Sequence, residues 1–258
     1  MGIAFRAYFL LVCLFALWVG AWGFLAPAQV DRALPWTIPP LHARFIAAFY
    51  LGGTLAMAAS LFARRPGEVR IAIVLAIVWT GILLLVSLLH LEAFDFAKPQ
   101  VAFWMGAYAV YPLWGAWLYR RSAASDPPAR RPADAALVIV AALSLALGAA
   151  LLVAPAAMVH AWPWPVTPLL AQIYAGPFLA YGTSTLLLAR EARPEARRIV
   201  LASVLAFALL ALLASLLHLR VFRFDRPSAW TWFAAFAATA AVAALRLALN
   251  ERRRSART

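Results

Sequence analysis

The sequence predicts an all-α integral membrane protein with eight transmembrane helices, arranged as two parallel four-helix repeats with both termini on one side. Two observations predict a membrane protein. Of the 258 residues, 66% are hydrophobic and only 13% are charged, and the mean hydropathy is +0.83. Soluble domains carry about 25% charged residues, and the apolar runs here have the length of about 20 residues that crosses a bilayer.

A third observation, an internal repeat, predicts how the helices are organised. The segment 87–91 (Ser-Leu-Leu-His-Leu) recurs at 215–219, which is an offset of 128 residues. The Pro-Trp pair at 35–36 recurs at 163–164 with the same offset. Four spans in each copy return the chain to the side from which it entered, so both copies insert in the same direction. The sequence therefore predicts a duplication with parallel repeats.

The apolar runs and the prolines between them place the helices. Prolines stop one helix and fit the first turn of the next. The expected helices are 5–25, 41–62, 69–91 and 99–121 in the first repeat, and 135–153, 168–189, 197–219 and 228–249 in the second. We expect the first run to be a span, because it is longer than the apolar core of about 7–15 residues in a signal peptide. The predicted organisation is a first membrane repeat (1–121), a cytoplasmic Pro/Arg linker (122–134), a second membrane repeat (135–250) and a basic cytoplasmic tail (251–258).

The distribution of basic residues predicts the orientation of the chain. Of its 23 lysine and arginine residues, 17 lie at the helix ends and loops on the side of the two termini. Short loops rich in arginine stay in the cytoplasm, so we expect both termini there and the arginines in contact with anionic lipids. Arginine used in place of lysine, with abundant alanine, indicates a GC-rich bacterial genome and thus a bacterial inner membrane. The net charge of +13 is divided among these loops, which does not predict a nucleic-acid-binding surface.

Two equivalent histidines and the aromatic residues near them form the candidate site. His90 and His218 are related by the repeat and lie at the outer ends of their helices. We expect a ligand-contacting or lipid-contacting vestibule on the outer face, formed by His90, His218, Trp36, Trp164, Phe94 and Phe222. Binding of a metal, haem or quinone is an alternative for the histidines. A further alternative is that the histidines cap helix ends and the aromatic residues form an interfacial belt.

The two repeats differ in charge next to these histidines. Glu92 and Asp95 in the first copy become Arg220 and Arg223 in the second. If the two loops meet across the pseudo-twofold axis, opposite charges would face each other. We therefore expect inter-repeat charge pairs, each contributing about 0–1 kcal/mol because the residues are exposed; unpaired, solvated charges are the alternative.

The sequence favours a non-enzymatic protein, because the common catalytic and phosphate-binding motifs are absent from it. No catalytic residue, metal site or cofactor is predicted, with haem as the alternative. A small-solute transporter is a second hypothesis, since duplicated carriers enclose a central site, and its path would include Gln172, Tyr174 and Tyr181. A membrane redox protein or a lipid-modifying protein that uses the two histidines is the third.

Overall fold

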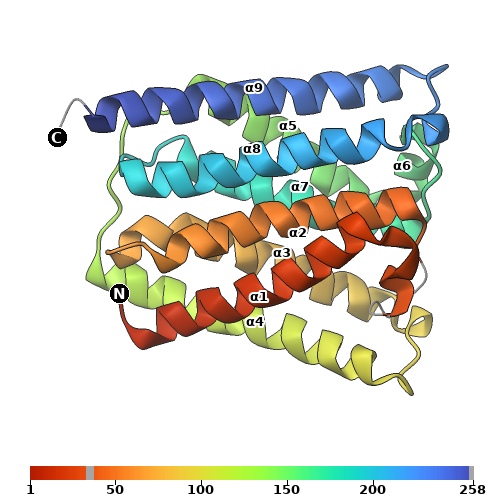
Figure 1. Ribbon diagram of the computed structural model, residues 1–258, viewed down its shortest axis with the longest axis horizontal. Coiled ribbons are helices and arrows are strands. Elements are labelled where there is room, and N and C mark those ends of the chain that lie inside the picture. Colours follow the sequence, from red (N-terminus) through yellow and green to blue (C-terminus); the bar gives the residue numbers. More distant parts are fainter. Residues whose placement is uncertain (33–37, 256–258) are drawn as a thin grey trace.

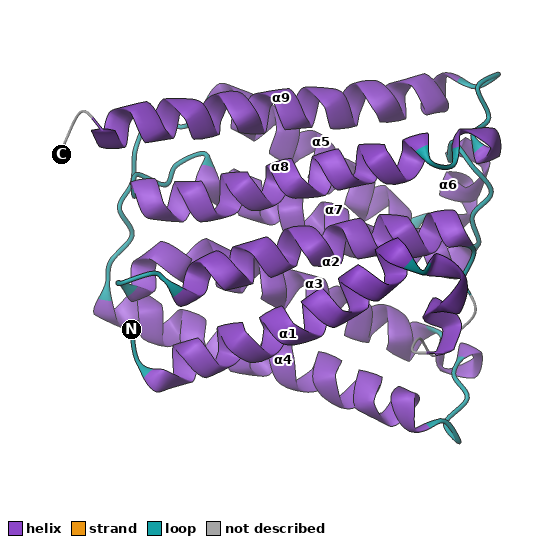
Figure 2. Cartoon of the chain, in the orientation of Figure 1, coloured by secondary structure: helices purple, strands orange, loops and turns teal. Residues whose placement is uncertain are grey.

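The computed structural model describes residues 1–32 and 38–255, and in these residues every regular element is a helix (Figure 2). The eight long helices are α1 (Ile3–Leu25), α2 (Pro40–Leu61), α3 (Arg70–Leu89), α4 (Pro99–Ser125), α5 (Ala135–Val153), α7 (Pro168–Leu188), α8 (Pro194–Leu216) and α9 (Pro227–Ser255). The short helices are η1 (Pro27–Arg32), η2 (Pro66–Val69), η3 (Leu91–Ala93), α6 (Pro155–Ala161) and η4 (Leu219–Val221).

Proline sets the start of most of the long helices. The first residue is proline in α2, α4, α7, α8 and α9. A proline at this position loses nothing, because the first N–H groups of a helix have no intrahelical acceptor, and its fixed φ suits the helix. The predicted helix positions are thus close to those observed, and α5 spans the predicted 135–153.

The long helices form two layers of four (Figure 1). One layer has the order α1, α2, α8, α9, and the other has the order α4, α3, α7, α5. Neighbours within a layer make the extensive contacts of the fold, whereas contacts between the layers are fewer. The join between the two halves of the chain is therefore made by α2 with α8 and by α3 with α7.

Close contacts within a layer occur at glycines. A Cβ on Gly20 of α1 would lie 2.9 Å from Cγ of Leu51 in α2. A Cβ on Gly148 of α5 would lie 2.8 Å from Cγ of Leu179 in α7. Small residues allow the backbones of membrane helices to approach closely. The second contact lies 128 residues after the first, as the predicted duplication requires, although the duplication itself stays a prediction.

Six helices in the described residues are long and apolar enough to cross a membrane, which indicates a helical membrane protein. They are Ile3–Leu25, Pro40–Leu61, Pro66–Leu89, Ala135–Val153, Pro194–Leu216 and Pro227–Arg252. The predicted spans at 99–121 and 168–189 form α4 and α7, which are helical but less apolar. The expectation of eight spans therefore stays a prediction for these two helices.

The segment between the two halves differs from its sequence-based prediction. The helix expected to end at residue 121 continues for another turn, to Ser125. The rest of the linker is held by backbone hydrogen bonds to the segment after α7: Ala192 N donates to Ala129 O (3.0 Å), and Arg131 N donates to Arg190 O (2.9 Å). Backbone pairing of this kind needs no apolar side chains, so the hydropathy pattern gives no sign of it.

Candidate functional site

The histidine end of the molecule is the end at which α3 and α8 finish, opposite the end at which α1 begins and α9 ends (Figure 1). His90 is the C-terminal cap residue of α3. His218 lies two residues beyond the end of α8. Each histidine is held by a side chain from the other half of the chain, so the structure gives the two histidines separate partners.

His90 belongs to a polar group that joins α3 to α7. Gln172 donates its Nε2 to the Leu152 carbonyl oxygen (2.9 Å), which leaves Gln172 Oε1 facing His90 Nε2 at 2.5 Å. Because Oε1 can only accept, His90 Nε2 carries the proton. The other ring nitrogen, Nδ1, lies 3.4 Å from the Glu92 carboxylate. Both ring nitrogens of His90 therefore face acceptor groups.

His218 belongs to the equivalent group that joins α8 to α2. Arg44 donates its Nε to the Phe24 carbonyl oxygen (3.0 Å) and its Nη1 to His218 Nε2 (2.6 Å). An arginine can only donate, so His218 Nε2 must be unprotonated. Partial burial and, next, the positive charge of Arg44 lower the pKa of His218 from its ordinary value. The two equivalent histidines thus have opposite electrostatic surroundings.

A third histidine, which sequence analysis missed, lies between the halves. His42 of α2 is buried, and its Nδ1 lies 2.5 Å from the hydroxyl of Tyr174 in α7. Nothing in the repeat indicates this residue, since its equivalent is Leu170. Sequence analysis also missed Arg44. A signal for it was present, since Arg44 and Gln172 are equivalent through the 128-residue offset and both are polar residues in apolar runs.

The predicted aromatic residues of the site lie in the protein core rather than on an open surface. Trp164 is fully buried, and Phe94 and Phe222 are buried as well. The rings of Trp164 and Phe222 pack 4.9 Å apart between centroids. Trp36 lies outside the described residues. The expectation that these residues contact a ligand stays a prediction.

The predicted inter-repeat charge pairs are not brought together. Glu92 lies against His90, and Asp95 pairs with Lys98 at 3.8 Å. Arg223 uses its backbone N–H to donate to the Pro163 carbonyl oxygen at 2.8 Å, and no contact in the described residues joins Arg220 to either carboxylate. Local partners a few residues away are reached with less loss of side-chain freedom than distant exposed ones.

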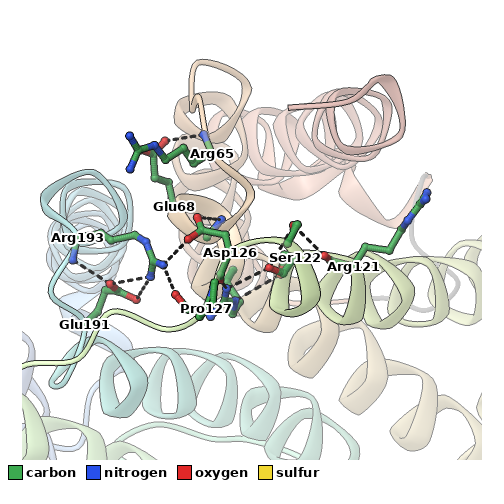
Figure 3. Close-up of polar contacts among 11 residues, drawn as sticks. Arg65, Glu68, Arg121, Ser122, Asp126, Pro127, Glu191 and Arg193 are labelled. Carbon is green, nitrogen blue, oxygen red and sulfur yellow. Dashed lines mark hydrogen bonds and ion pairs between the residues drawn. The ribbon is translucent and has the colours of Figure 1, made fainter.

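At the opposite, arginine-rich end, an ion-pair network ties the halves together (Figure 3). Asp126, the C-terminal cap residue of α4, accepts from Arg193 Nη2 at 2.7 Å and from the Gly67 backbone N–H at 3.0 Å. Arg193 also pairs with Glu191 at 3.3 Å. Burial alone would raise the pKa of Asp126. The hydrogen bond and charge of Arg193, the Gly67 amide and the charge of Arg70 outweigh burial, and the pKa lies below its ordinary value.

Each half of the chain encloses a cavity between its four long helices. The first-half cavity, of about 40 Å³, is lined by Val12, Phe15, Ala16, Phe49, Tyr50, Gly53, Met57, Leu75, Ala76, Trp79, Thr80, Tyr108 and Tyr111. The second-half cavity, of about 390 Å³, is lined by Ala136, Ile139, Val140, Leu143, Ser144, Leu147, Phe178, Tyr181, Thr185, Val204, Phe207, Ala235, Phe236, Ala238, Thr239 and Val242. Ten residues of the second wall lie 128 positions after residues of the first, so the cavities occupy equivalent places.

Smaller side chains at two equivalent positions contribute to the larger volume of the second-half cavity. Phe15 and Tyr111 of the first-half cavity are replaced by Leu143 and Thr239 in the second-half cavity. Leu143 is also 67% exposed, which shows that the second-half cavity opens to the outside of the molecule on the α5 side. Sequence analysis did not predict this cavity. A position-by-position comparison of side-chain size between the halves would have indicated it.

The wall of the second-half cavity is mainly apolar, and two of its hydroxyl groups have protein partners. Ser144 donates to the Phe178 carbonyl oxygen at 2.8 Å, and the Tyr181 hydroxyl pairs with Ser203 Oγ at 2.8 Å. Among the described residues there is no group of three or more His, Cys, Asp or Glu that could hold a metal ion. Comparison of the chain with protein-family models, with curated proteins and with solved structures finds no match.

Proposed function

We propose that this chain is a non-enzymatic multi-pass membrane protein that binds the apolar chain of a bilayer molecule in the second-half cavity. The observation that carries the proposal is the cavity itself. Its volume of about 390 Å³ falls within the range of about 300–1,000 Å³ that small-molecule sites occupy. A mainly apolar cavity does not hold water well and favours an apolar occupant.

The position of the cavity supports lateral entry from the bilayer. Ile139 and Leu143 of α5 line it and are 60% and 67% exposed, so its opening lies on the apolar flank of a helix that is long enough to span. In the equivalent place of the first half, bulky residues leave only about 40 Å³. On this proposal the first half has a packing role, and the second half has diverged to bind.

The proposed topology has eight spans, with the arginine-rich end in the cytoplasm of a bacterial cell and the histidine end outside. Helix α7 lies between α3 and α5 in its layer and buries most of its side chains, so its polar residues are not required to face lipid. The recurrence of helix starts and glycine contacts at the 128-residue offset supports a duplication with parallel repeats. Labelling of introduced cysteines with a membrane-impermeant maleimide in intact cells tests the orientation. Glu92→Cys should react, and Arg130→Cys should react only after the membrane is opened.

A cavity-filling experiment tests the binding proposal. The variant Leu143→Phe/Thr239→Tyr installs the side chains that the first half has at the equivalent positions. Leu113→Phe, at a 73% exposed position of α4 outside both cavity walls, is the matched control. Each protein is reconstituted with a phosphatidylcholine that carries a photoreactive acyl chain, and labelled peptides are identified by mass spectrometry.

We expect the wild type and the control to be labelled on α5 and α9 at the cavity wall, and the filled variant to lose most of this labelling. The melting temperature of the filled variant should match or exceed that of the wild type, because filling a cavity adds contacts. Equal labelling of the filled variant and the wild type at the cavity wall would refute the proposal.

A further inference from the structure

A second cavity, the basic pocket, lies at the arginine-rich end of the same helices. It has a volume of about 350 Å³ and is lined by Arg131, Pro132, Asp134, Ala192, Pro194, Arg197, Arg246, Leu249 and Asn250. The linker, the segment between α7 and α8, the start of α8 and the last turns of α9 contribute these residues. Three arginines and one aspartate give the wall a net positive charge. Its polar wall contrasts with the apolar wall of the second-half cavity.

The contacts of the pocket leave one buried donor without an acceptor in the protein. Arg246 Nη2 donates to Asp134 at 2.8 Å, and Arg131 lies 3.9 Å from the same carboxylate. Arg246 Nε is buried and has no hydrogen-bond partner within the protein. Arg197 is 4% exposed and donates to the Leu188 and Glu191 carbonyl oxygens. A buried donor without an acceptor is costly, so an anion that supplies oxygen acceptors would stabilise this arrangement.

The basic pocket and the second-half cavity lie in register along α5 and α9. Arg246 of the pocket is one helical turn from Val242 of the cavity, a rise of about 6 Å. Asp134 of the pocket is two residues from Ala136 of the cavity. If an anionic group with an apolar tail binds in the pocket, even a short tail can therefore reach the second-half cavity. The tail would enter on the side of the molecule where the cavity is open.

We propose that these two cavities form one site for a phosphate-bearing anionic lipid, with the phosphate in the basic pocket and an acyl chain in the second-half cavity. This inference rests on the proposed function, to which it adds the chemical class of the headgroup. Arginine suits phosphate because its planar donors bind phosphate oxygens in pairs. A basic pocket between membrane helices on the cytoplasmic side is placed where anionic headgroups lie.

The test compares two photoreactive probes with the same acyl chain, one a phosphatidylglycerol and one a phosphatidylcholine. Each is added in trace amount to phosphatidylcholine vesicles that contain the full-length protein. Arg246→Gln and Arg131→Gln remove donors from the pocket. The second variant guards against loss of folding, since the Arg131 side chain makes only the longer contact to Asp134. Arg121→Gln is the matched control, because Arg121 lies on α4 outside the pocket and packs over the Trp117 ring.

We expect the phosphatidylglycerol probe to label the cavity wall more strongly than the phosphatidylcholine probe in the wild type and in Arg121→Gln. Each pocket variant should lower phosphatidylglycerol labelling about fivefold, the factor expected for one arginine near a membrane surface, and leave phosphatidylcholine labelling unchanged. Equal labelling of the wild type by the two probes would overturn the headgroup assignment. If the variant Leu143→Phe/Thr239→Tyr still lost cavity labelling by both probes, the proposed function would stand.

One further outcome would also overturn the inference. If inorganic phosphate abolishes the preference for phosphatidylglycerol and raises the melting temperature of lipid-depleted wild type but not of Arg246→Gln, the pocket takes free phosphate and not a lipid. Absence of cavity labelling by either probe in the wild type would refute the proposed function together with the inference.

Discussion

A close contact between the two halves of the chain predicts the effect of a single methyl group. Gly52 of α2 faces α8, and a Cβ at this position would lie 2.9 Å from Phe207 Cβ and 3.1 Å from the Ser203 carbonyl oxygen. It would also lie 2.5 Å from the Tyr181 hydroxyl, which can move. Because the Phe207 and Ser203 atoms are fixed to the α8 backbone, Gly52→Ala must push α2 and α8 apart.

The neighbouring residue supplies an internal control for the size of this effect. A Cβ on Gly53 would meet no atom within 4 Å. Replacing glycine by alanine inside a helix gains about 1 kcal/mol, and both variants share this gain. Only Gly52→Ala has the overpacking cost, which is about 1–3 kcal/mol. We therefore expect Gly53→Ala to be stabilised by up to about 1 kcal/mol, and Gly52→Ala to be less stable than Gly53→Ala by about 1–3 kcal/mol.

Thermal denaturation of the detergent-purified variants, followed by size-exclusion chromatography, measures this difference. For a chain of this size, 1 kcal/mol corresponds to about 2–4 °C in melting temperature. Gly52→Ala should therefore melt about 2–12 °C below Gly53→Ala. Equal melting temperatures would show that α2 and α8 are not in close contact at Gly52. The packing of α2 against α8 as the join between the halves would then be wrong.

Two further predictions concern charged groups at the two ends of the molecule. Asp126→Asn should destabilise the protein by about 1–3 kcal/mol, between the values for exposed and buried ion pairs, because it removes one of the two carboxylates that pair with the partly buried Arg193. Asp95→Asn, which removes an exposed pair, should cost less than about 1 kcal/mol. His218 has a lowered pKa in the folded protein, so the unfolded chain binds this proton first, and stability should fall as the pH drops below about 6.5. Between pH 8 and pH 5, the melting temperature of His218→Gln should therefore fall less than that of the wild type. An unchanged pH dependence would contradict the contact with Arg44.

The helices could be predicted from the sequence because two strong signals agree at each boundary. Apolar runs define the helices, and a proline such as Pro168 or Pro227 marks the first turn. The prediction was less accurate where neither signal applies. Helix α4 extends to Ser125 through polar residues, and nothing in the hydropathy of 122–134 indicates backbone pairing with the segment after α7.

The site could be predicted only in part, because its contacts join distant segments. The repeat identified His90 and His218, but their partners Gln172 and Arg44 lie in the other half of the chain. A sequence repeat shows which residues correspond and not which residues touch. His42 is a further case, since it is present in one copy only and its partner Tyr174 is 132 residues away.

The arrangement of the layers predicts that the two halves cannot fold separately. The contact of α2 with α8 and that of α3 with α7 are extensive, whereas α2 has few contacts with α3, and α7 has few with α8. A fragment of residues 1–128 would expose Arg44 without His218, and a fragment of residues 129–258 would expose Gln172 without His90. An unpaired polar group costs about 1–3 kcal/mol, and each fragment would also lose the packing along two helices.

Expression of the two fragments, separately and together, tests this prediction. The cut after Pro128 leaves the backbone pairing of 129–134 within the second fragment and places the Asp126–Arg193 ion pair across the cut. We expect each fragment alone to aggregate in detergent, and the co-expressed pair to purify as one complex. The variant Arg193→Gln should weaken this complex more than it weakens the uncut protein, because the linker no longer supplies a covalent connection. Two monodisperse fragments with cooperative melting would show that each half has its own core. The contacts between α2 and α8 and between α3 and α7 would then be a docking interface rather than the framework of the fold.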